Sequence, residues 1–246
     1  MANFIKRMLS YNGSMEYVEL NDHDIVDNYQ HEFVIDYYRP HIEGKKVLDA
    51  GCWTGPLEKT ITKKGIQTDL TGIDENNDAL AVARRNFPHF SFEQCQLMSG
   101  NEEFVAKYAG TFDTVIFLDV IEHVPKGKEG VALQFFRKLL KPDGVLIVST
   151  MRSHFLNPID PAWMLGHRHY SKKNLESILS GAGFGVVENQ EIGNLYWDLD
   201  MLYFYICKHI FRTPYNTSQK MRERILKGLK GSLVPTRFYL KAQKKA

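Results

Sequence analysis

The sequence predicts an α/β fold: a Rossmann-like, mostly parallel sheet of seven strands with helices on both faces and an antiparallel last strand. Three observations support this prediction. Short apolar runs alternate with helix-length segments between residues 46 and 150, which is typical of right-handed βαβ units. A glycine-containing turn at 51–55 joins the first strand to the first helix, as expected at the carboxyl edge of an open α/β sheet. A helical insertion separates the last two strands.

The first strand and helix are predicted from local signals. Residues 46–50 (KVLDA) form a short, mostly apolar run that indicates a buried strand. Residues 56–64 follow as a helix, because Pro56 suits a first helical turn and Thr54 can act as its N-cap. Gly65 is expected to end this helix.

The next elements continue the alternation up to residue 150. The helix predicted at 76–86 is expected to stop before Pro88, and the helix predicted at 129–140 is expected to end at the KPDG turn of residues 141–144. The predicted elements are strands at 68–74, 90–95, 112–118 and 145–150, and helices at 76–86 and 129–140.

The last part of the chain closes the sheet edge around an insertion. Ser171 is expected to cap a helix at 172–179. Strands are predicted at 184–192 and 236–243, and the helical insertion lies between them at about 195–232. These last two strands complete the seven.

The first 45 residues precede the first strand. Residues 25–38 have a helical pattern that would cover the sheet or the mouth of a ligand site. We therefore expect residues 1–45 to form an N-terminal helical cap and residues 46–246 to form one domain.

Composition places the chain among globular proteins. Of its 246 residues, 43% are hydrophobic and 24% are charged, which is close to the average for such domains. Its three cysteines, at positions 52, 95 and 207, show no C-x-x-C spacing, so we expect neither a disulfide framework nor a zinc site. The sequence shows neither a signal peptide nor an apolar run that could span a membrane. A cytoplasmic protein is expected.

The net charge of +2 hides an asymmetry along the chain. Residues 207–246 contain eleven of the 31 Lys and Arg residues and one acid, Glu223. Such a basic, partly apolar region suits an anionic partner, for example a membrane surface. The alternative is a solvated basic face without a partner.

The turn at 51–55 indicates the kind of ligand. Gly51 allows close approach of the backbone, and Gly55 allows tight packing of the helix start. The spacing G-x-x-x-G differs from the G-x-G-x-x-G of dinucleotide sites, and the carboxylate of Asp49 suits a cation. Asp74 ends the second strand, where an acid can bind a ribose diol. The expected ligand is therefore a nucleoside that carries positive charge.

Four motifs resemble class I S-adenosylmethionine (SAM)-dependent methyltransferases, most of all the quinone-biosynthesis (methyltransferase type 11) group. Their order and spacing agree with that group over roughly residues 40–190. The motifs are LDAGCWTG at 48–55, GID at 72–74, FLDVIEHV at 117–124 and LLKPDGVL at 139–146.

The resemblance implies SAM as cofactor and a set of contact residues. Two positions depart from the family pattern: Trp53 stands where relatives usually have glycine, and Gln96 stands where they usually have an acid that holds adenine. Gln96 can still accept a hydrogen bond from adenine through its amide oxygen. The implied cofactor residues are Asp49, Gly51, Cys52, Trp53, Gly55, Asp74, Glu75, Gln96, Leu97, Leu118 and Asp119.

Methyl transfer to a hydroxyl also needs a base. We favour His123 and His169 as catalytic candidates; Glu122, His154 and His167 are further candidates near the same edge. Two alternatives stay open. The histidines can be purely structural, or His123 can join Asp119 and Glu122 in a divalent metal site, as the resemblance to some quinone-type relatives implies.

The insertion is rich in aromatic residues between 195 and 211. A lid over an apolar substrate, peripheral membrane contact, internal packing and a homodimer interface would each explain these residues. No nucleic-acid-binding motif is present, so no nucleic-acid partner is expected.

The predicted function is methyl transfer to a small-molecule or lipid- or sugar-linked acceptor, with oxygen as the preferred atom. The alternative is a catalytically inactive SAM-binding scaffold or partner subunit, which the substitution at Trp53 suggests. A nicotinamide-dependent oxidoreductase is a distant third.

Overall fold

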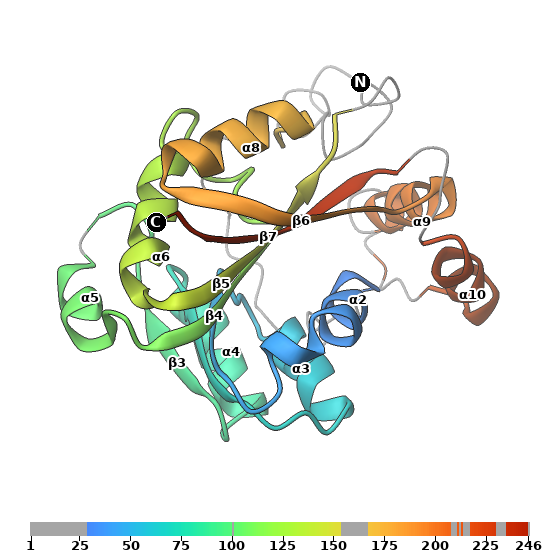
Figure 1. Cartoon of the computed structure of the whole chain (residues 1–246). Helices are drawn as coiled ribbons and strands as arrows, with labels where there is room; N and C mark the ends of the chain where they lie inside the picture. The colour runs from blue at the N-terminus through green and yellow to red at the C-terminus, as the bar shows by residue number, and fades with distance from the viewer. Residues whose placement is uncertain are drawn as a thin grey trace, which may run out of the picture.

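A computed structural model describes residues 29–99, 101–153, 167–207, 211, 213, 217–229 and 235–245 (Figure 1). Several sequence predictions lie outside these residues. They are the start of the predicted helix at 25–38, the base candidate His154 and most of the loop after the fifth strand. The predicted boundary between residues 45 and 46 stays a prediction.

The core element is a seven-stranded sheet with the order β3-β2-β1-β4-β5-β7-β6. Its neighbouring strands are parallel except β7, which is antiparallel to both β5 and β6. This confirms the predicted fold class. The strands are β1 (Lys46–Ala50), β2 (Asp69–Asp74), β3 (Ser91–Gln94), β4 (Phe112–Leu118), β5 (Leu140–Met151), β6 (Phe184–Ile192) and β7 (Arg237–Lys244).

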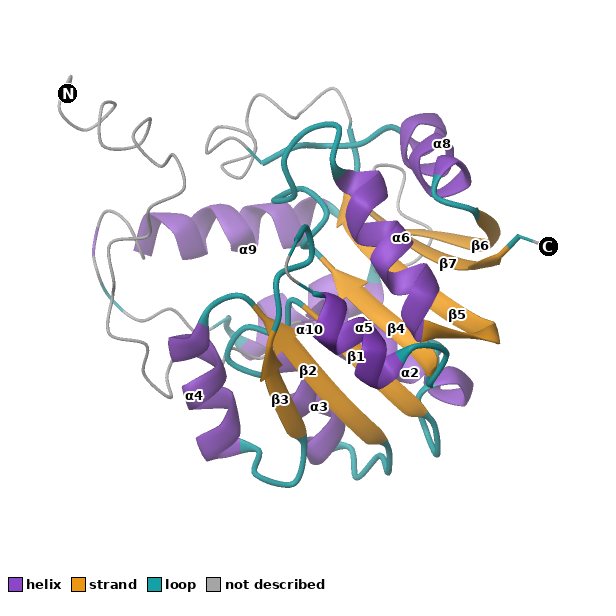
Figure 2. Ribbon diagram, turned by 90° about the vertical axis from the view of Figure 1, so that its left-hand side faces the viewer, coloured by secondary structure: helices purple, strands orange, loops and turns teal. Residues whose placement is uncertain are grey.

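Helices cover both faces of the sheet (Figure 2). On one face, α2 (Tyr29–Tyr37) and α3 (Pro56–Lys63) pack on the sheet through one buried cluster, and α4 (Asn77–Asn86) packs beside β3. On the other face, α5 (Glu102–Tyr108), α6 (Glu129–Leu139) and α8 (Lys172–Gly181) enclose the largest cluster. The sheet is therefore buried on both sides, which explains its apolar strands.

The insertion between β6 and β7 contains α9 (Leu195–Ile206) and α10 (Gln219–Lys227). Both helices lie beyond the β6 and β7 side of the sheet, next to α2 (Figure 1). In the part of the chain that the structure describes, no helix is both long and apolar enough to cross a membrane.

Three local features differ from the predictions. Thr54 does not cap α3: the N-cap is Gly55, with a φ of 89°, and no side chain accepts a hydrogen bond there. The helix α5 was not predicted, because its seven residues give little periodic signal. Strand β5 begins at Leu140 instead of Val145, because the predicted turn continues in the strand with a register shift opposite Phe112.

The predicted cap Ser171 is confirmed, since its side chain accepts a hydrogen bond from the Asn174 N–H.

Candidate active site

The glycine turn lies at the carboxyl end of β1, where the strand order reverses between β1 and β4. Gly51 has a φ of 84°, and a Cβ there would lie 2.5 Å from a methyl group of Val120. The N–H groups of Gly51 and Cys52 both donate to the Ile73 carbonyl of β2, at 2.7 and 3.0 Å. The turn is therefore held against β2, in the crevice where open α/β sheets bind ligands.

Two further residues of the turn have left-handed backbones. Gly55 has a φ of 89°, and a Cβ on it would lie 2.7 Å from the ring of Phe87. Trp53 has a φ of 49°, which costs a non-glycine residue about 1–2 kcal/mol. That conformation explains why glycine is usual at this position in the resembling family. Trp53 is half-buried, and its N–H donates to the Asp74 carboxylate at 3.0 Å.

Asp74 ends β2 beside the turn. One carboxylate oxygen accepts from the Trp53 N–H at 3.0 Å, and the other accepts from the Asn76 N–H at 2.9 Å. Burial raises the pKa of Asp74, and these backbone hydrogen bonds act in the opposite direction. Because each carboxylate oxygen can accept two hydrogen bonds, both can still receive a hydroxyl of a ligand.

A second carboxyl group lies under the same turn. Asp49 is 5% exposed near the end of β1, and Glu58 is fully buried in the first turn of α3. Burial raises the pKa of both carboxyl groups; the charge of Asp74 adds to the shift of Asp49, and the charge of Asp49 adds to that of Glu58. Cys52 is also buried, in a small core with Leu80 and Phe92. Its thiol is buried there and donates a weak hydrogen bond to the Trp53 carbonyl at 3.9 Å, so the backbone of Cys52 is the part that can meet a ligand.

The other predicted cofactor residues lie along the carboxyl edges of β2, β3 and β4. Glu75 is exposed directly after β2. Gln96 is exposed two residues after β3, where its amide oxygen accepts a long hydrogen bond from the Ser99 hydroxyl at 3.4 Å. Leu97 is half-buried against the large core, and Leu118 is the last residue of β4. The structure thus brings the predicted set to one edge of the sheet.

Asp119 follows β4 in a constrained conformation. Its φ is 50°, and the Ser149 hydroxyl of β5 donates to its carboxylate at 2.8 Å. Strained backbones of this kind cost about 1–3 kcal/mol and cluster at functional sites. His31 of α2 lies close enough to feel this charge: burial lowers the pKa of His31 to about 4, and the Asp119 carboxylate opposes that shift.

His31 was not among the sequence candidates. It is 6% exposed and is buried on the same side as Val34 and Ile35 of α2 and Tyr38, which directly follows the helix. Its spacing was the signal that could have found it: His31 precedes these apolar residues by three, four and seven positions, which is the spacing of one helix face. Glu58 was missed because an acid in the first turn of a helix usually faces water.

The segment after β4 carries Glu122 and His123. Glu122 is buried and accepts a hydrogen bond from the Thr150 hydroxyl at 3.0 Å; burial and the charge of Asp119 raise its pKa. His123 is exposed on the loop, and its partial desolvation lowers its pKa. Among the described residues, no three His, Cys, Asp or Glu side chains converge as metal ligands. The structure therefore does not form a ligand cluster from Asp119, Glu122 and His123.

Arg168 ties the segment after β5 to the segment after β4. Its guanidinium binds the Glu129 carboxylate at 2.7 Å and donates to the carbonyls of Ile121, at 2.9 Å, and Val124. The Tyr170 hydroxyl donates to the Ile121 carbonyl at 3.2 Å. Within this arrangement the rings of His123 and His167 meet edge to face, with centroids 4.6 Å apart.

His169 lies on the same segment as Arg168 and is half-buried. Among the described residues, the ring that contacts the His123 ring is that of His167. The structure therefore brings His123 and His167 together.

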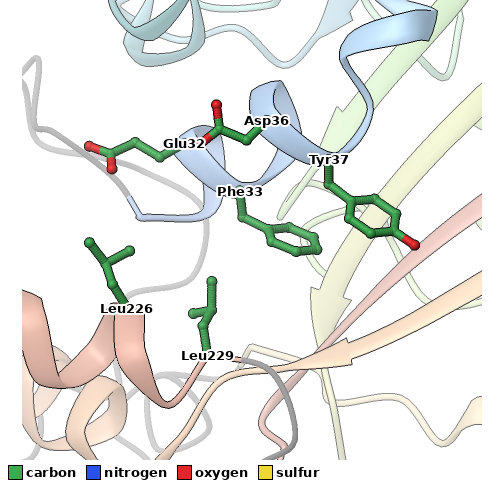
Figure 3. A pocket seen from close by; sticks show the side chains of 6 residues that line it. All are labelled: Glu32, Phe33, Asp36, Tyr37, Leu226 and Leu229. Atoms are coloured by element: carbon green, nitrogen blue, oxygen red, sulfur yellow. The ribbon is translucent and has the colours of Figure 1, made fainter.

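A separate pocket of about 340 Å³ lies between α2 and the end of α10 (Figure 3). Leu226 and Leu229 point from α10 and the turn after it toward α2. Its two acids are engaged elsewhere: Glu32 pairs with Arg222, and Asp36 pairs with Lys64. None of its lining residues belongs to the predicted site.

Comparisons with known proteins agree with this geometry. Residues 17–189, well over half of the chain, match the family model described as a methyltransferase domain. Two solved structures share the fold: a TehB-like SAM-dependent methyltransferase from Corynebacterium glutamicum and magnesium protoporphyrin IX methyltransferase from Synechocystis. The first has a TM-score of 0.56 at 17% identity and covers 99% of this chain and 97% of its own. The second has a TM-score of 0.56 at 16% identity and covers 100% and 94%.

Curated relatives match a shorter region. The ubiquinone biosynthesis O-methyltransferase of Cronobacter sakazakii is 36% identical over 108 residues, which is 44% of this chain and 43% of that protein. The matched region thus spans less than half the length of this relative. The family model and the solved structures nevertheless agree on one class. The chain belongs to the methyltransferase domain family and has the fold of the class I SAM-dependent methyltransferases.

Proposed function

We propose that the protein transfers the methyl group of SAM to a hydroxyl of a small-molecule or lipid- or sugar-linked acceptor. One observation carries this proposal. The glycine turn, the Asp49 carboxyl and the Asp74 carboxylate meet at the edge where β1 and β2 end. Together they suit a ligand that has both a sugar diol and a positive charge.

The residues fit the parts of SAM. A Cβ on Gly51 would clash with Val120, so this position carries no side chain and the cofactor can lie against the backbone of the turn. Asp74 would receive the ribose hydroxyls, with Glu75 beside it. Asp49 would attract the amino-acid ammonium, Gln96 and Leu97 would contact adenine, and Leu118 and Asp119 would border the methionine part. These are the roles that the family resemblance implies, and the positions of the residues along the sheet edge are compatible with them.

Bound SAM supplies an electrophilic methyl group, so the protein mainly has to hold the acceptor in line with it. His123 lies at the rim of the same edge with His167 against it. Because partial desolvation lowers its pKa, its imidazole is neutral near pH 7 and can accept a proton from the acceptor. We propose His123 as the base and keep His169 as a candidate acceptor contact.

The preference for oxygen draws support from the curated relatives, which are O-methyltransferases of ubiquinone biosynthesis. A quinone-type or phenolic hydroxyl is therefore the first acceptor class to screen, ahead of lipid- and sugar-linked hydroxyls. The inactive-scaffold alternative differs in one outcome, since it requires cofactor binding without turnover on any acceptor.

The first experiment is isothermal titration of the purified protein with S-adenosylhomocysteine (SAH), with NADH as the control. We expect micromolar binding of SAH alone. Methyl transfer from labelled SAM to a phenol and quinol panel would then identify the acceptor. Binding of NADH in place of SAH would overturn the proposal, and SAH binding with no transfer to any acceptor would favour a scaffold.

We also propose that the surface of α9 and α10 contacts a membrane. Several apolar side chains of this surface are at least 40% exposed, and α10 contributes basic residues next to them. This combination suits the boundary between lipid headgroups and acyl chains. The exposed apolar residues are Leu195, Tyr196, Leu199 and Tyr203.

A further inference from the structure

Glu58 is the most unusual buried group in the described part of the chain. Its side chain has no exposed surface, and neither carboxylate oxygen has a hydrogen-bond partner at normal distance. A Cβ on Gly55 would lie 3.4 Å from one of these oxygens. The carboxyl group therefore lies directly beneath the turn that we assign to the cofactor.

The neighbours of Glu58 add negative charge. Asp49 of β1 lies nearest, Asp74 of β2 acts on Asp49, and the thiol of Cys52 feels all three carboxyl groups. Glu75 in turn acts on Asp74. No Lys or Arg among the described residues forms an ion pair with Asp49 or Glu58. The site is thus an acidic pair without a cation of its own.

Two buried carboxyl groups in contact cannot both ionise without a counter-charge. Burial raises the pKa of each; Asp49 raises the pKa of Glu58 further, whereas Glu58 lowers the pKa of Asp49, which Asp74 raises. Near neutral pH the pair therefore keeps a proton while no cation is bound, and this proton belongs to the pair as a unit.

We propose that Glu58 is a second carboxylate of the site for the amino-acid ammonium of the cofactor, and that cofactor binding expels one proton from the Asp49–Glu58 pair. This inference rests on the proposed function. The ammonium brings three N–H donors, which match the unpaired carboxylate oxygens, whereas a sulfonium brings none. One carboxyl O–H bond breaks, the proton passes to the buffer, and the arriving positive charge is balanced by the new carboxylate.

The test is calorimetric titration with SAH at one near-neutral pH, in buffers of different ionisation enthalpy. The slope of observed enthalpy against buffer enthalpy gives the number of protons released. We expect a release approaching one, and an affinity that rises by up to about tenfold per pH unit where the pair titrates. Methylthioadenosine shares the nucleoside but lacks the ammonium, so it should bind with no release.

The variant E58Q keeps the shape of the side chain and removes the shared proton. It should bind SAH with a smaller proton release and a weaker dependence on pH than the wild type, because burial and the charge of Asp74 still raise the pKa of Asp49. The control E103Q changes an exposed acid at the start of α5 and should release the proton as the wild type does. Circular dichroism would confirm that both variants fold; if E58Q does not, the comparison of SAH with methylthioadenosine in wild type decides.

The outcomes separate the two proposals. SAH binding without net proton release, or full release from folded E58Q, overturns the role of Glu58 and leaves the proposed function standing. Equal release by methylthioadenosine overturns the ammonium assignment. Failure of SAH to bind the wild type overturns both proposals together.

Discussion

Asp74 is the single residue whose contacts define the cofactor side of the site. Its two oxygens hold the N–H groups of Trp53 and Asn76 and face the glycine turn. The variant D74A should lose the ribose hydrogen bonds and weaken SAH binding by about 1–3 kcal/mol, or roughly 5- to 150-fold. Isothermal titration measures this change. The control D78A alters an exposed acid in the first turn of α4. Equal affinities of D74A and D78A would remove Asp74 from the site.

Single residues were also where the sequence was least informative. The positions of Asp49, Gly51 and Asp74 could be predicted, because each ends a strand or begins a turn. The left-handed backbones of Trp53 and Asp119 could not, since both depend on how the turn packs against β2 and β5. The burial of Glu58 was equally hidden, because it arises from contacts between elements distant in the chain.

Arg168 fixes the segment before α8 relative to the segment after β4. It links the segment before α8 to the carbonyls after β4 and to Glu129 of α6. Lysine cannot reproduce such a planar set of donors. We expect R168K to speed amide hydrogen exchange in peptides covering 119–125 and to leave peptides of β1 and α3 unchanged, as measured by mass spectrometry. The exposed control R39K should exchange as wild type.

The same R168K variant tests whether Arg168 contributes to catalysis. If Arg168 positions His123, R168K should lower kcat for the acceptor once identified, with SAH affinity kept within about twofold. Unchanged exchange at 119–125 would show that other contacts hold this loop.

The α9 surface makes a prediction at the level of a helix. Leu195 and Leu199 lie one turn apart and are 49% and 54% exposed. We expect the protein to cosediment with vesicles that contain phosphatidylglycerol and L195S/L199S to do so several-fold less. The control V131S alters an apolar residue on α6 that is 41% exposed and should bind as wild type does. Equal sedimentation of all three proteins would show that α9 makes no contact with lipid.

Elements with strong periodicity were predicted well, and short or irregular ones were not. The bounds of β1, β4 and β6 agree with the predictions, because apolar runs and flanking turns mark them clearly. The helix α5 escaped because seven residues carry about two turns of signal. The start of β5 was misplaced because Pro142 and Gly144 indicate a turn, although this stretch continues the strand.

The whole molecule should respond to pH through its buried acids. Burial raises the pKa of Asp49, Glu58 and Glu122, so the folded state holds protons that the unfolded chain releases above about pH 4–5. Their contribution to stability is complete below that range and is lost as pH rises through the raised pKa values. Above about pH 7.5, His31, with its pKa lowered to about 4, is neutral in both states and adds no slope.

Scanning calorimetry across pH would measure this dependence. The Tm of the ligand-free protein should fall from neutral to alkaline pH, and E58Q should fall less, with each kcal/mol worth about 2–4 °C in a chain of this size. Saturating SAH should flatten the wild-type curve. A Tm that rises over the same pH range would contradict the buried protonated acids.

At the scale of the whole molecule, the sequence alone was sufficient to predict the architecture. Alternating apolar and helical segments predicted the seven strands, and β7 is indeed antiparallel to its neighbours. The acceptor could not be predicted, because the fold hosts many chemistries and the residues that face an acceptor lie on loops.

The place of β7 has a consequence for how the protein folds during synthesis. Because β7 lies between β5 and β6, β6 has no partner in the sheet until residues 237–244 leave the ribosome. Until then the β5 edge is open to other chains, and the nascent protein is most prone to aggregate in this interval. Chaperone binding to stalled nascent chains should therefore peak after β6 has emerged and decline only when β7 inserts.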